Sequence, residues 1–547
     1  MKEILKQTHE LIDNLKAVCT NYGLGNTGNE YKIITETFLY KFLNDKFLYE
    51  IKTNLSRFKS ATTREIEDSL AKMSDEELNS QTMYVSPNTA ILKPTQFISY
   101  LFNRHAQPDF HKLFDDTLND ISEANKDIFS VKAGEGASVK LFEPLSNYVV
   151  QPERRDDFCA AIITKLADVN FGELFNQKYD FFAEIVEYLI KDYNKDFGKY
   201  AEYYTPHSIA RIIAKILIVG AVRNARIYDP AAGSGTLILA LAHEIGEDRC
   251  TLYAQDISQK SNEILRLNLI LNNLVHSLPN VIQDDTLLNP RHLTPRRDNI
   301  ETFNYVVSNP PFNMDFSETR DALAGDNYRA RFFAGVPNTP PKKKDSMAIY
   351  LLFLQHIIKS MNKHGKAAVV VPTGFLTAAT GIPLRIRQHI ISEKILRGVI
   401  SMPSNIFANT GTNVSVVFLD ADGSPDNKAL LVDASNLGTK QRIEGTRNQR
   451  TYLSDDEIEH IIDTFNSRKE VEDFNVLVSL DDIAQKNCSF SAGQYFKVKI
   501  EYVDLSPKEF QEKMCGFQSD LRKFFDEGHQ LEHDILQQLE SLSHEES

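Results

Sequence analysis

The chain of 547 residues has few cysteines, no long apolar segment and no excess of positive charge. The five cysteines lie far apart and form no Cys-x-x-Cys pair: Cys19, Cys159, Cys250, Cys488 and Cys515. An odd and scattered set indicates neither a disulfide framework nor a zinc site, so we expect reduced thiols and no bound metal. No apolar run approaches the ~20 residues that cross a bilayer, and residues 1–5 resemble an amphipathic helix rather than a signal peptide. We therefore expect a cytoplasmic protein with no membrane partner.

The formal net charge of −14 argues against a protein that coats nucleic acid by bulk electrostatics. Residues 291–344 are an exception, because they hold nine Lys or Arg against six Asp or Glu, a local charge of +3. Two interpretations of this stretch stay open. It is either a solvated loop or a surface that contacts phosphates near a target base.

The chain is too long for a single hydrophobic core, so several domains are expected. Residues 1–170 show the spacing of amphipathic helices and no catalytic pattern. From residue 171 onward, short β-rich runs alternate with helical segments, as in a doubly wound parallel sheet. We predict a helical amino-terminal domain (1–170), a catalytic domain (171–475) and a helical carboxy-terminal extension (476–547).

The predicted catalytic domain is of the α/β class, and seven apolar runs supply a Rossmann-like sheet: residues 226–228, 251–254, 280–282, 305–307, 367–371, 396–401 and 414–419. The residues after 419 look helical and acidic. Ligands of such sheets bind at the carboxyl ends of the strands. Four candidate residues fall there and are expected on one edge: Asp229, Asp256, Asp285 and Asn309.

The loop 229–235, Asp-Pro-Ala-Ala-Gly-Ser-Gly, follows the first predicted strand. Its glycines let the backbone approach a ligand and its N–H groups lie at a helix start, so it can hold a nucleoside-bearing cofactor. The contacts expected from it are Asp229, Ala231, Gly233, Ser234 and Gly235. A pyrophosphate cofactor is disfavoured, because Ile238 occupies the position of the third glycine in the dinucleotide fingerprint.

Two acidic residues follow later strands. Asp256 ends the second strand, where a carboxylate can accept from both hydroxyl groups of a ribose. Asp285 follows the third strand and can accept from an adenine amine. The alternative for each is an Asp that caps the next helix.

A second loop precedes the first strand. Thr205 is expected to cap a helix that Pro206 opens. Tyr203 and Tyr204 suggest aromatic walls for the methionine end of a cofactor, and a simple helix start is the alternative.

The tetrapeptide 309–312, Asn-Pro-Pro-Phe, is the most specific pattern in the chain. The Asn309 side-chain oxygen and the Pro310 carbonyl can accept both hydrogens of a planar, weakly nucleophilic amine and aim its lone pair at a methyl donor. Phe312 can stack on a base flipped out of a duplex. Together with the glycine loop, the motif predicts methyl transfer from S-adenosylmethionine to an exocyclic amine, most commonly adenine N6 in DNA. A purely structural turn is the alternative, and attack on cytosine C5 is set aside because no cysteine follows a proline.

The last segment begins at residues 506–509, Ser-Pro-Lys-Glu, which is a typical helix start. Apolar residues then recur at nearly heptad spacing: Phe510, Met514, Phe517, Leu521, Phe524, Leu531, Ile535 and Leu542. Such a stripe serves either a partner subunit or the chain's own body.

The order of these motifs, completed by residues 367–372 and by Phe407, Gly411 and Asn413, resembles the modification subunit of type I restriction–modification systems. The resemblance implies an adenine-N6 methyltransferase core with S-adenosyl-L-methionine as cofactor. It also implies cofactor contacts at the glycine loop, at Asp256 and at six residues of the preceding loop: Glu202, Tyr203, Tyr204, Thr205, Pro206 and His207. The chain departs from the family pattern twice, because Asp256 stands where Glu is usual and Asp284 replaces a glycine.

The resemblance further implies double-stranded DNA as substrate and an assembly of two modification subunits with one specificity (S) subunit, to which restriction (R) subunits add. The carboxy-terminal helix would then pack on the S subunit, which would choose the site. The competing interpretations are a stand-alone or phage-defence adenine methyltransferase, a protein glutamine-amide methyltransferase and a non-catalytic clamp.

Overall fold

The computed structural model describes residues 2–25, 27–129, 131–133, 137–139, 141–172, 175, 205–407, 413–442, 449–496 and 506–543. The chain divides into two compact units, Met1–Tyr495 and Phe496–Ser547. The finer division at residues 170 and 475 stays a prediction.

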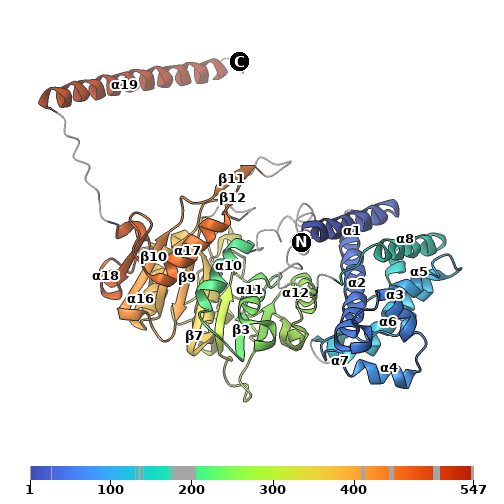
Figure 1. Cartoon of the computed structure of the whole chain (residues 1–547). Helices are drawn as coiled ribbons and strands as arrows, with labels where there is room; N and C mark the ends of the chain where they lie inside the picture. Colours follow the sequence, from blue (N-terminus) through green and yellow to red (C-terminus); the bar gives the residue numbers. More distant parts are fainter. Residues whose placement is uncertain are drawn as a thin grey trace. The chain divides into compact units, whose positions relative to one another are not determined.

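The amino-terminal part of the first unit is mainly helical (Figure 1). Its helices are α1 (Lys2–Asn21), α2 (Gly28–Asn54), α3 (Thr63–Leu70), α4 (Asp75–Thr82), α5 (Ile98–Phe102), α6 (Phe110–Ala124), α7 (Lys126–Phe129) and α8 (Arg155–Ala167). A small antiparallel pair, β1 (Val131–Ala133) and β2 (Ala137–Val139), follows α7. Helices α3 and α4 each begin at a capping box, Thr62 with Glu65 and Ser74 with Glu77. Such reciprocal bonds satisfy N–H groups that the first turn of a helix leaves free.

The rest of the first unit is built on one large sheet. Its strands are β3 (Ala225–Asp229), β4 (Cys250–Asp256), β5 (Val281–Gln283), β6 (Phe303–Ser308), β7 (Met361–Pro372), β8 (Leu396–Ser401), β9 (Val414–Asp420), β10 (Lys428–Asp433) and β13 (Asn475–Ser479). The order across the sheet is β13-β10-β8-β9-β7-β6-β3-β4-β5. All seven predicted strands are present.

The predicted strand count is wrong, because the described part of the sheet has nine strands. Strands β10 and β13 extend it beyond β8, and β11 (Thr439–Arg442) and β12 (Gln449–Tyr452) form a separate hairpin. The expectation that the residues after 419 are helical is therefore corrected. The sheet is also not purely parallel, since β9 runs antiparallel to β7 and β8, and β13 to β10.

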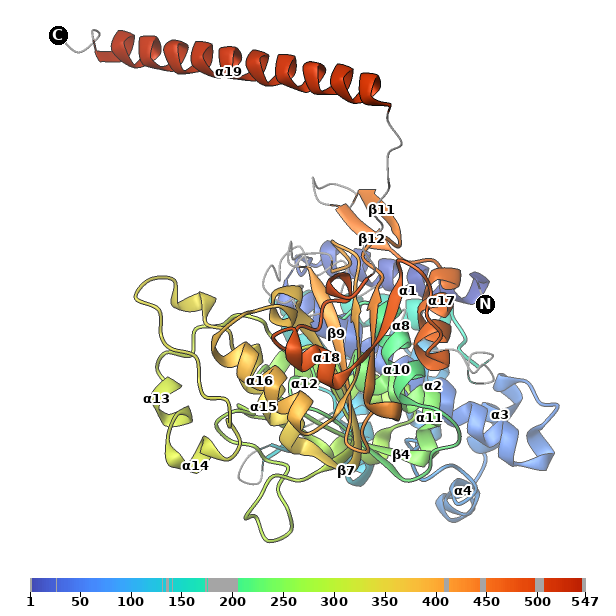
Figure 2. The ribbon, with the colours of Figure 1, turned by 90° about the vertical axis from the view of Figure 1, so that its left-hand side faces the viewer.

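Helices cover both faces of the sheet, as Figure 2 shows. Those beside the sheet are α10 (His207–Leu217), α11 (Thr236–Ile245), α12 (Gln259–Leu271), α15 (Tyr350–Ser360), α16 (Gly381–Ser392), α17 (Asp455–Ser467) and α18 (Leu480–Gln485). Two short helices, α13 (Arg320–Leu323) and α14 (Asp326–Arg329), lie between β6 and α15 along the chain. Every residue of β9 is buried, as expected for a strand enclosed by helices on both faces.

The parallel strands all end on the same side of the sheet, here called the carboxyl edge. It collects the residues that follow β3, β4, β5, β6, β7, β8 and β10, because these strands share one direction. The predicted gathering of strand-end residues on one edge is confirmed.

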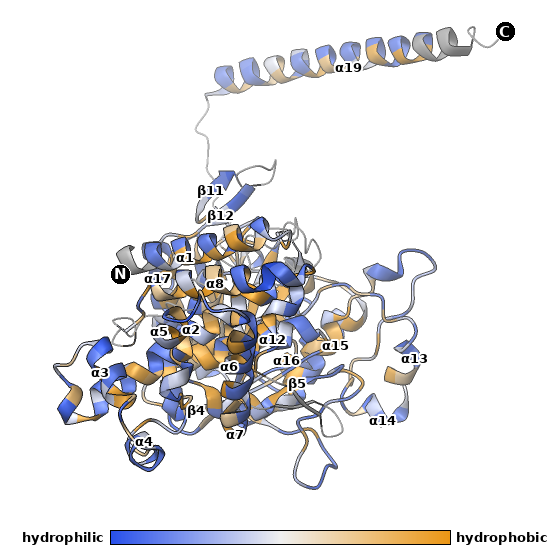
Figure 3. Ribbon diagram, turned by 90° about the vertical axis from the view of Figure 1, so that its right-hand side faces the viewer, coloured by the Kyte–Doolittle hydropathy of each residue, from blue (hydrophilic) through white to orange (hydrophobic). Residues whose placement is uncertain are grey.

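The second unit is helix α19 (Pro507–Ser543). It starts as predicted, at Ser506. The N–H and the hydroxyl of Ser506 donate to the Glu509 carboxylate, and the Glu509 N–H donates to the Ser506 hydroxyl oxygen. Figure 3 shows hydrophilic and hydrophobic residues alternating along it. Its large apolar side chains are exposed: Phe510, Met514, Phe517, Leu521, Phe524, Phe525, Leu531, Ile535 and Leu536. No helix of the described chain is long and apolar enough to span a membrane.

Candidate active site

The glycine loop turns sharply between β3 and α11. Gly233 and Gly235 have φ of +53° and +84°, a region that side chains other than glycine rarely adopt. A Cβ at Gly235 would overlap the Leu265 side chain, whereas a Cβ at Gly233 would meet no atom within 4 Å. Gly235 is therefore needed for packing, and Gly233 leaves open space at the start of α11 where a ligand can approach the backbone.

Asp229 joins this loop to the Asn-Pro-Pro-Phe motif. Its Oδ1 accepts from the Ala231 N–H at 2.9 Å and from the Ser308 hydroxyl at 2.8 Å. Burial raises the pKa of Asp229 to about 7. Ser308 was not among the predicted site residues. The available signal was a hydroxyl directly before Asn309, at the end of a buried strand.

Asp256 fixes the loop from the other side. Its Oδ2 accepts from the Gly233 N–H and its Oδ1 from the Ser258 N–H, both at 2.8 Å. Burial raises its pKa. The carboxylate thus orients the glycine loop, and each oxygen keeps a second lone pair for a ribose hydroxyl.

Asp285 accepts through Oδ1 from the N–H groups of Leu287 at 2.8 Å and Leu288 at 3.2 Å. This contact resembles the helix-capping alternative that the sequence left open. The neighbouring Asp284 forms an ion pair with Arg291 at 2.5 Å. Asp285 therefore has only its second oxygen clear of these backbone contacts.

Asn309 is 8% exposed, and its Nδ2 donates to the Thr205 hydroxyl at 3.2 Å. With the amide nitrogen held in this way, Oδ1 is the atom left to accept from a substrate amine. The prediction that Thr205 caps helix α10 is wrong. The helix begins at His207, with Pro206 at the N-cap and no side-chain cap bond.

The two predicted loops are thus brought together through Thr205. His207 is half-buried at the first turn of α10, and Pro206 is buried. The predicted contacts Glu202, Tyr203 and Tyr204 lie outside the described residues.

The remaining motif residues line the same edge. Pro310 is buried, and Phe312 is half-buried, with its ring centroid 6.3 Å from that of Tyr350 in an edge-to-face contact. An aromatic side chain held in this way keeps part of its surface free for stacking.

The basic stretch 291–344 divides into exposed and structural cations. Lys342, Lys343 and Lys344 are exposed. Arg331 is only 8% exposed, and its guanidinium donates to the carbonyl groups of Thr286 and Leu287. Burial lowers its pKa to about 10. Arg331 therefore holds the segment after Asp285 and is not available to a phosphate.

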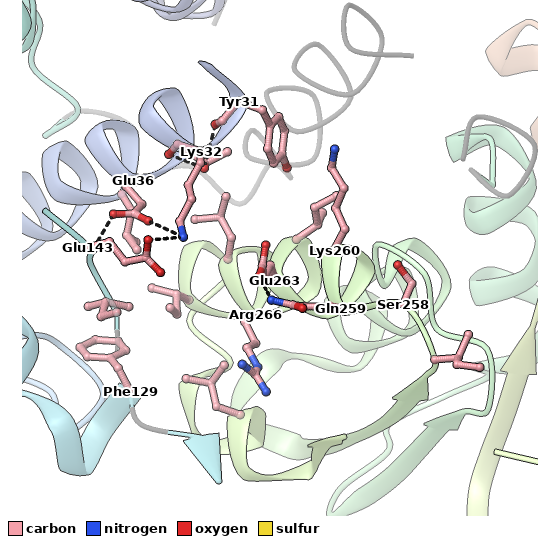
Figure 4. Close-up of a pocket in the computed structure, with 18 residues that line it drawn as sticks. Tyr31, Lys32, Glu36, Phe129, Glu143, Ser258, Gln259, Lys260, Glu263 and Arg266 are labelled. Atoms are coloured by element: carbon pink, nitrogen blue, oxygen red, sulfur yellow. Dashed lines mark hydrogen bonds and ion pairs between the residues drawn. The ribbon is translucent and has the colours of Figure 1, made fainter. Parts of the chain in front are cut away.

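A separate cleft of about 680 Å³ lies between α2 and α12 (Figure 4). Its charged residues are Lys32, Glu36, Glu143, Lys260, Glu263 and Arg266. None of the predicted site residues lines it. Within the described chain, no group of three or more His, Cys, Asp or Glu side chains is placed to hold a metal ion.

Residues 177–502 match the model of the N-6 DNA Methylase family. The type I restriction enzyme MpnII methylase subunit of Mycoplasma pneumoniae is 25% identical over 543 residues, 94% of each chain. The MjaIX methylase subunit of Methanocaldococcus jannaschii is 27% identical over 72% of this chain and 69% of its own. The crystal structure of a type I methyltransferase subunit from Streptococcus thermophilus has the same fold, with a TM-score of 0.70, 19% identity, and coverage of 90% of this chain and 100% of that one.

Proposed function

The chain belongs to the N-6 DNA methylase family and is a DNA methyltransferase for the N6 amino group of adenine, and we propose that it serves as the methylation subunit of a type I restriction–modification enzyme. The family decides against the protein-amide alternative. The relatives named as type I methylase subunits cover most of this chain, which supports the subunit role over a stand-alone enzyme.

The orientation of Asn309 carries the chemical part of the proposal. Thr205 accepts the bond from the amide nitrogen, so Asn309 Oδ1 is presented as an acceptor at the carboxyl edge. Accepting from the N6 amino group, together with the Pro310 carbonyl, would draw the lone pair of that nitrogen out of the ring and toward the methyl donor. Phe312 would stack on the flipped adenine.

S-adenosyl-L-methionine would supply a methyl group on a positively charged sulfur. The residues present fit this cofactor, since Gly233 leaves open space beside the backbone and Asp256 offers acceptor oxygens at the end of β4. We assign ribose binding to Asp256 and adenine binding to the second oxygen of Asp285. Asp229, Ala231, Ser234 and Gly235 would shape the loop around the cofactor, and residues 202–207 would close its methionine end.

The partners proposed for this chain are double-stranded DNA, an S subunit, R subunits and a second copy of itself. Helix α19 supports the S subunit as partner, because a stripe of exposed apolar residues continues over the helix. Contiguous exposed apolar surface marks interaction sites in soluble proteins.

Replacing Asn309 by Ala tests the chemistry. Loss of a group that stabilises the transition state typically lowers the rate about 100- to 1000-fold, whereas cofactor affinity should stay within a few-fold of the wild type. The measurements are methyl transfer to adenine-containing duplex and calorimetric titration with the cofactor. Near-normal turnover of Asn309→Ala would contradict the proposed role.

Replacing Phe517 and Leu521 by Asp tests the partner helix. Two charges in an apolar seam cost several kcal/mol, so the variant should no longer co-elute with the S subunit in gel filtration. A matched control, Ser519→Asp with Lys523→Gln, makes the same change in charge on the other side of α19 and should still assemble. If the Phe517 and Leu521 variant unfolds on its own, the stripe belongs to this chain's core and the partner role is wrong.

A further inference from the structure

The hairpin of β11 and β12, here called the basic ribbon, is positively charged, whereas the chain as a whole is negatively charged. Its eight strand residues include Lys440, Arg442 and Arg450 and no Asp or Glu. All four residues of β11 are exposed, and Lys440 and Arg442 share one face of the hairpin because they are two positions apart. Arg450 is half-buried and lies across from Gln441, so it is on the opposite face. A hairpin with cations on both faces and no acidic strand residue, in a protein of net charge −14, points to an anionic partner.

The root of the ribbon, meaning the end at which its two strands join the rest of the first unit, lies at the carboxyl edge of the sheet. Strand β10 runs parallel to β8, with Asp433 beside Ser401, and the ribbon begins shortly after Asp433. Thr451 on β12 is bound to the segment that follows β8, because its N–H donates to the Asn405 carbonyl at 2.9 Å and its hydroxyl to the Ser404 carbonyl at 2.6 Å. Figures 1 and 2 show the ribbon extending beyond the end of the sheet.

Strand spacing gives the reach from Asn309 to this root. Asn309 directly follows β6, and β8 and β10 lie three and four strands away in the sheet. At about 4.8 Å between neighbouring strands, these steps correspond to roughly 14–19 Å. Phosphates follow one another about every 3.4 Å along each strand of a duplex, so the root of the ribbon lies about four to six nucleotides from the target base.

We propose that the basic ribbon binds the sugar–phosphate backbone of duplex DNA beside the flipped adenine. The inference rests on the proposed function, because it takes DNA to lie along the carboxyl edge. Lys440, Arg442 and Arg450 would position the duplex and neutralise phosphates without reading the base sequence. The shape suits this role, since an antiparallel pair projects cations while its root stays anchored to the sheet.

The test neutralises Lys440, Arg442 and Arg450 to Gln in the full-length chain and measures binding to an adenine-containing duplex at several salt concentrations. Each lost phosphate contact lowers the slope of log affinity against log salt by about 0.9, so three contacts lower it by up to about 2.7. The matched control replaces Lys363, Lys394 and Lys428 by Gln. These exposed lysines lie near the amino ends of β7, β8 and β10, at the opposite edge of the sheet, and the control should keep the wild-type slope.

A charge-conserving variant, Arg442→Lys with Arg450→Lys, should also keep the slope and controls for damage to the hairpin. The proposal is overturned if the ribbon variant keeps the wild-type slope, or if the control variant loses as much as the ribbon variant. An unchanged slope with loss of co-elution with the S subunit would assign the ribbon to a protein partner instead. If the wild-type chain shows the ribbon-dependent slope but transfers no methyl group to adenine even when assembled with the S subunit, the proposed function is contradicted and the ribbon's role is left intact.

Discussion

Buried carboxyl groups occur both at the carboxyl edge of the sheet and in the cleft between α2 and α12, and the two regions hold them differently. Burial raises the pKa of Asp229 at the edge to about 7 and that of Glu36 in the cleft to about 8. Asp229 accepts from a backbone N–H and from the Ser308 hydroxyl within 2.9 Å. Glu36 accepts from the Glu143 N–H at 2.9 Å, and the Lys32 ammonium is 4.0 Å away.

Both groups have a raised pKa, and the difference lies in what they hold: Asp229 fixes the geometry of the glycine loop, whereas Glu36 contacts no predicted site residue. At the edge, Asp229 and Asp256 connect strand ends to the glycine loop, so their loss should appear in cofactor binding and catalysis. In the cleft, Glu36 connects no predicted site residue, so its loss should appear in the pH dependence of stability. Three substitutions test this distinction, in decreasing order of their effect on cofactor affinity.

Asp256→Ala should have the largest effect on cofactor affinity. It removes the acceptors for the Gly233 and Ser258 N–H groups and those proposed for the ribose hydroxyls. Hydrogen bonds to a charged group are worth about 1.5–3 kcal/mol each, so the dissociation constant should rise at least about tenfold. Calorimetric titration measures this, with Asp256→Asn as a variant that keeps one acceptor oxygen. An unchanged constant would give Asp256 a purely structural role.

Ser308→Ala should have a smaller effect. The hydroxyl contacts the Asp229 carboxylate and no proposed substrate atom, so its loss loosens the connection between β3 and β6. A single hydrogen bond of about 0.5–1.5 kcal/mol corresponds to a loss of roughly 2- to 10-fold in methylation rate or cofactor affinity. Ser415→Ala is the control, because that buried hydroxyl pairs with the Thr373 hydroxyl rather than with a carboxylate. Equal effects of the two changes would remove the special role of Ser308.

The sequence was sufficient to predict the position of these residues along the chain, because local patterns determine where a buried strand ends. Asp229, Asp256 and Asn309 all follow such strands, and parallel pairing brings them to one edge. The contacts between them could not be predicted. Thr205 looked like a helix cap, yet it binds Asn309, which is 104 positions away. Such long-range bonds depend on packing and leave no periodic signal.

The errors have similar physical causes. Strand β10 has a short apolar run, Ala429 to Val432, that periodicity alone does not distinguish from a buried helical turn. Arg331 looked like one of several loop cations, but it is buried against two carbonyl groups of a segment far from it in sequence. Burial of an arginine by tertiary contacts is not encoded in its immediate neighbours.

Glu36→Gln should leave cofactor affinity unchanged and alter only the dependence of stability on pH. The ordinary pKa of a glutamate is 4.5, and burial raises that of Glu36 to about 8 in the folded protein. Between these values the folded chain holds a proton that the unfolded chain has released. The stability contributed by Glu36 is therefore complete below about pH 4.5 and is lost as pH rises through 8.

Glutamine cannot ionise, so the variant should match the wild type near pH 4.5, exceed it increasingly up to about pH 8 and keep a constant advantage above that pH. The gain is on the order of a few kcal/mol at most, since one pKa unit corresponds to about 1.36 kcal/mol. Thermal unfolding at pH 5, 7 and 9 measures it.

Lys32, Glu143 and Glu263 are the charged groups that act on Glu36, and Lys32 also lowers the pKa of Glu143 through a hydrogen bond. Glu143→Gln should therefore show the opposite trend, with a small loss at neutral pH that disappears in acid. If Glu36→Gln shifted unfolding equally at all three pH values, Glu36 would not be the titrating group, and the contrast between the cleft and the carboxyl edge would fail.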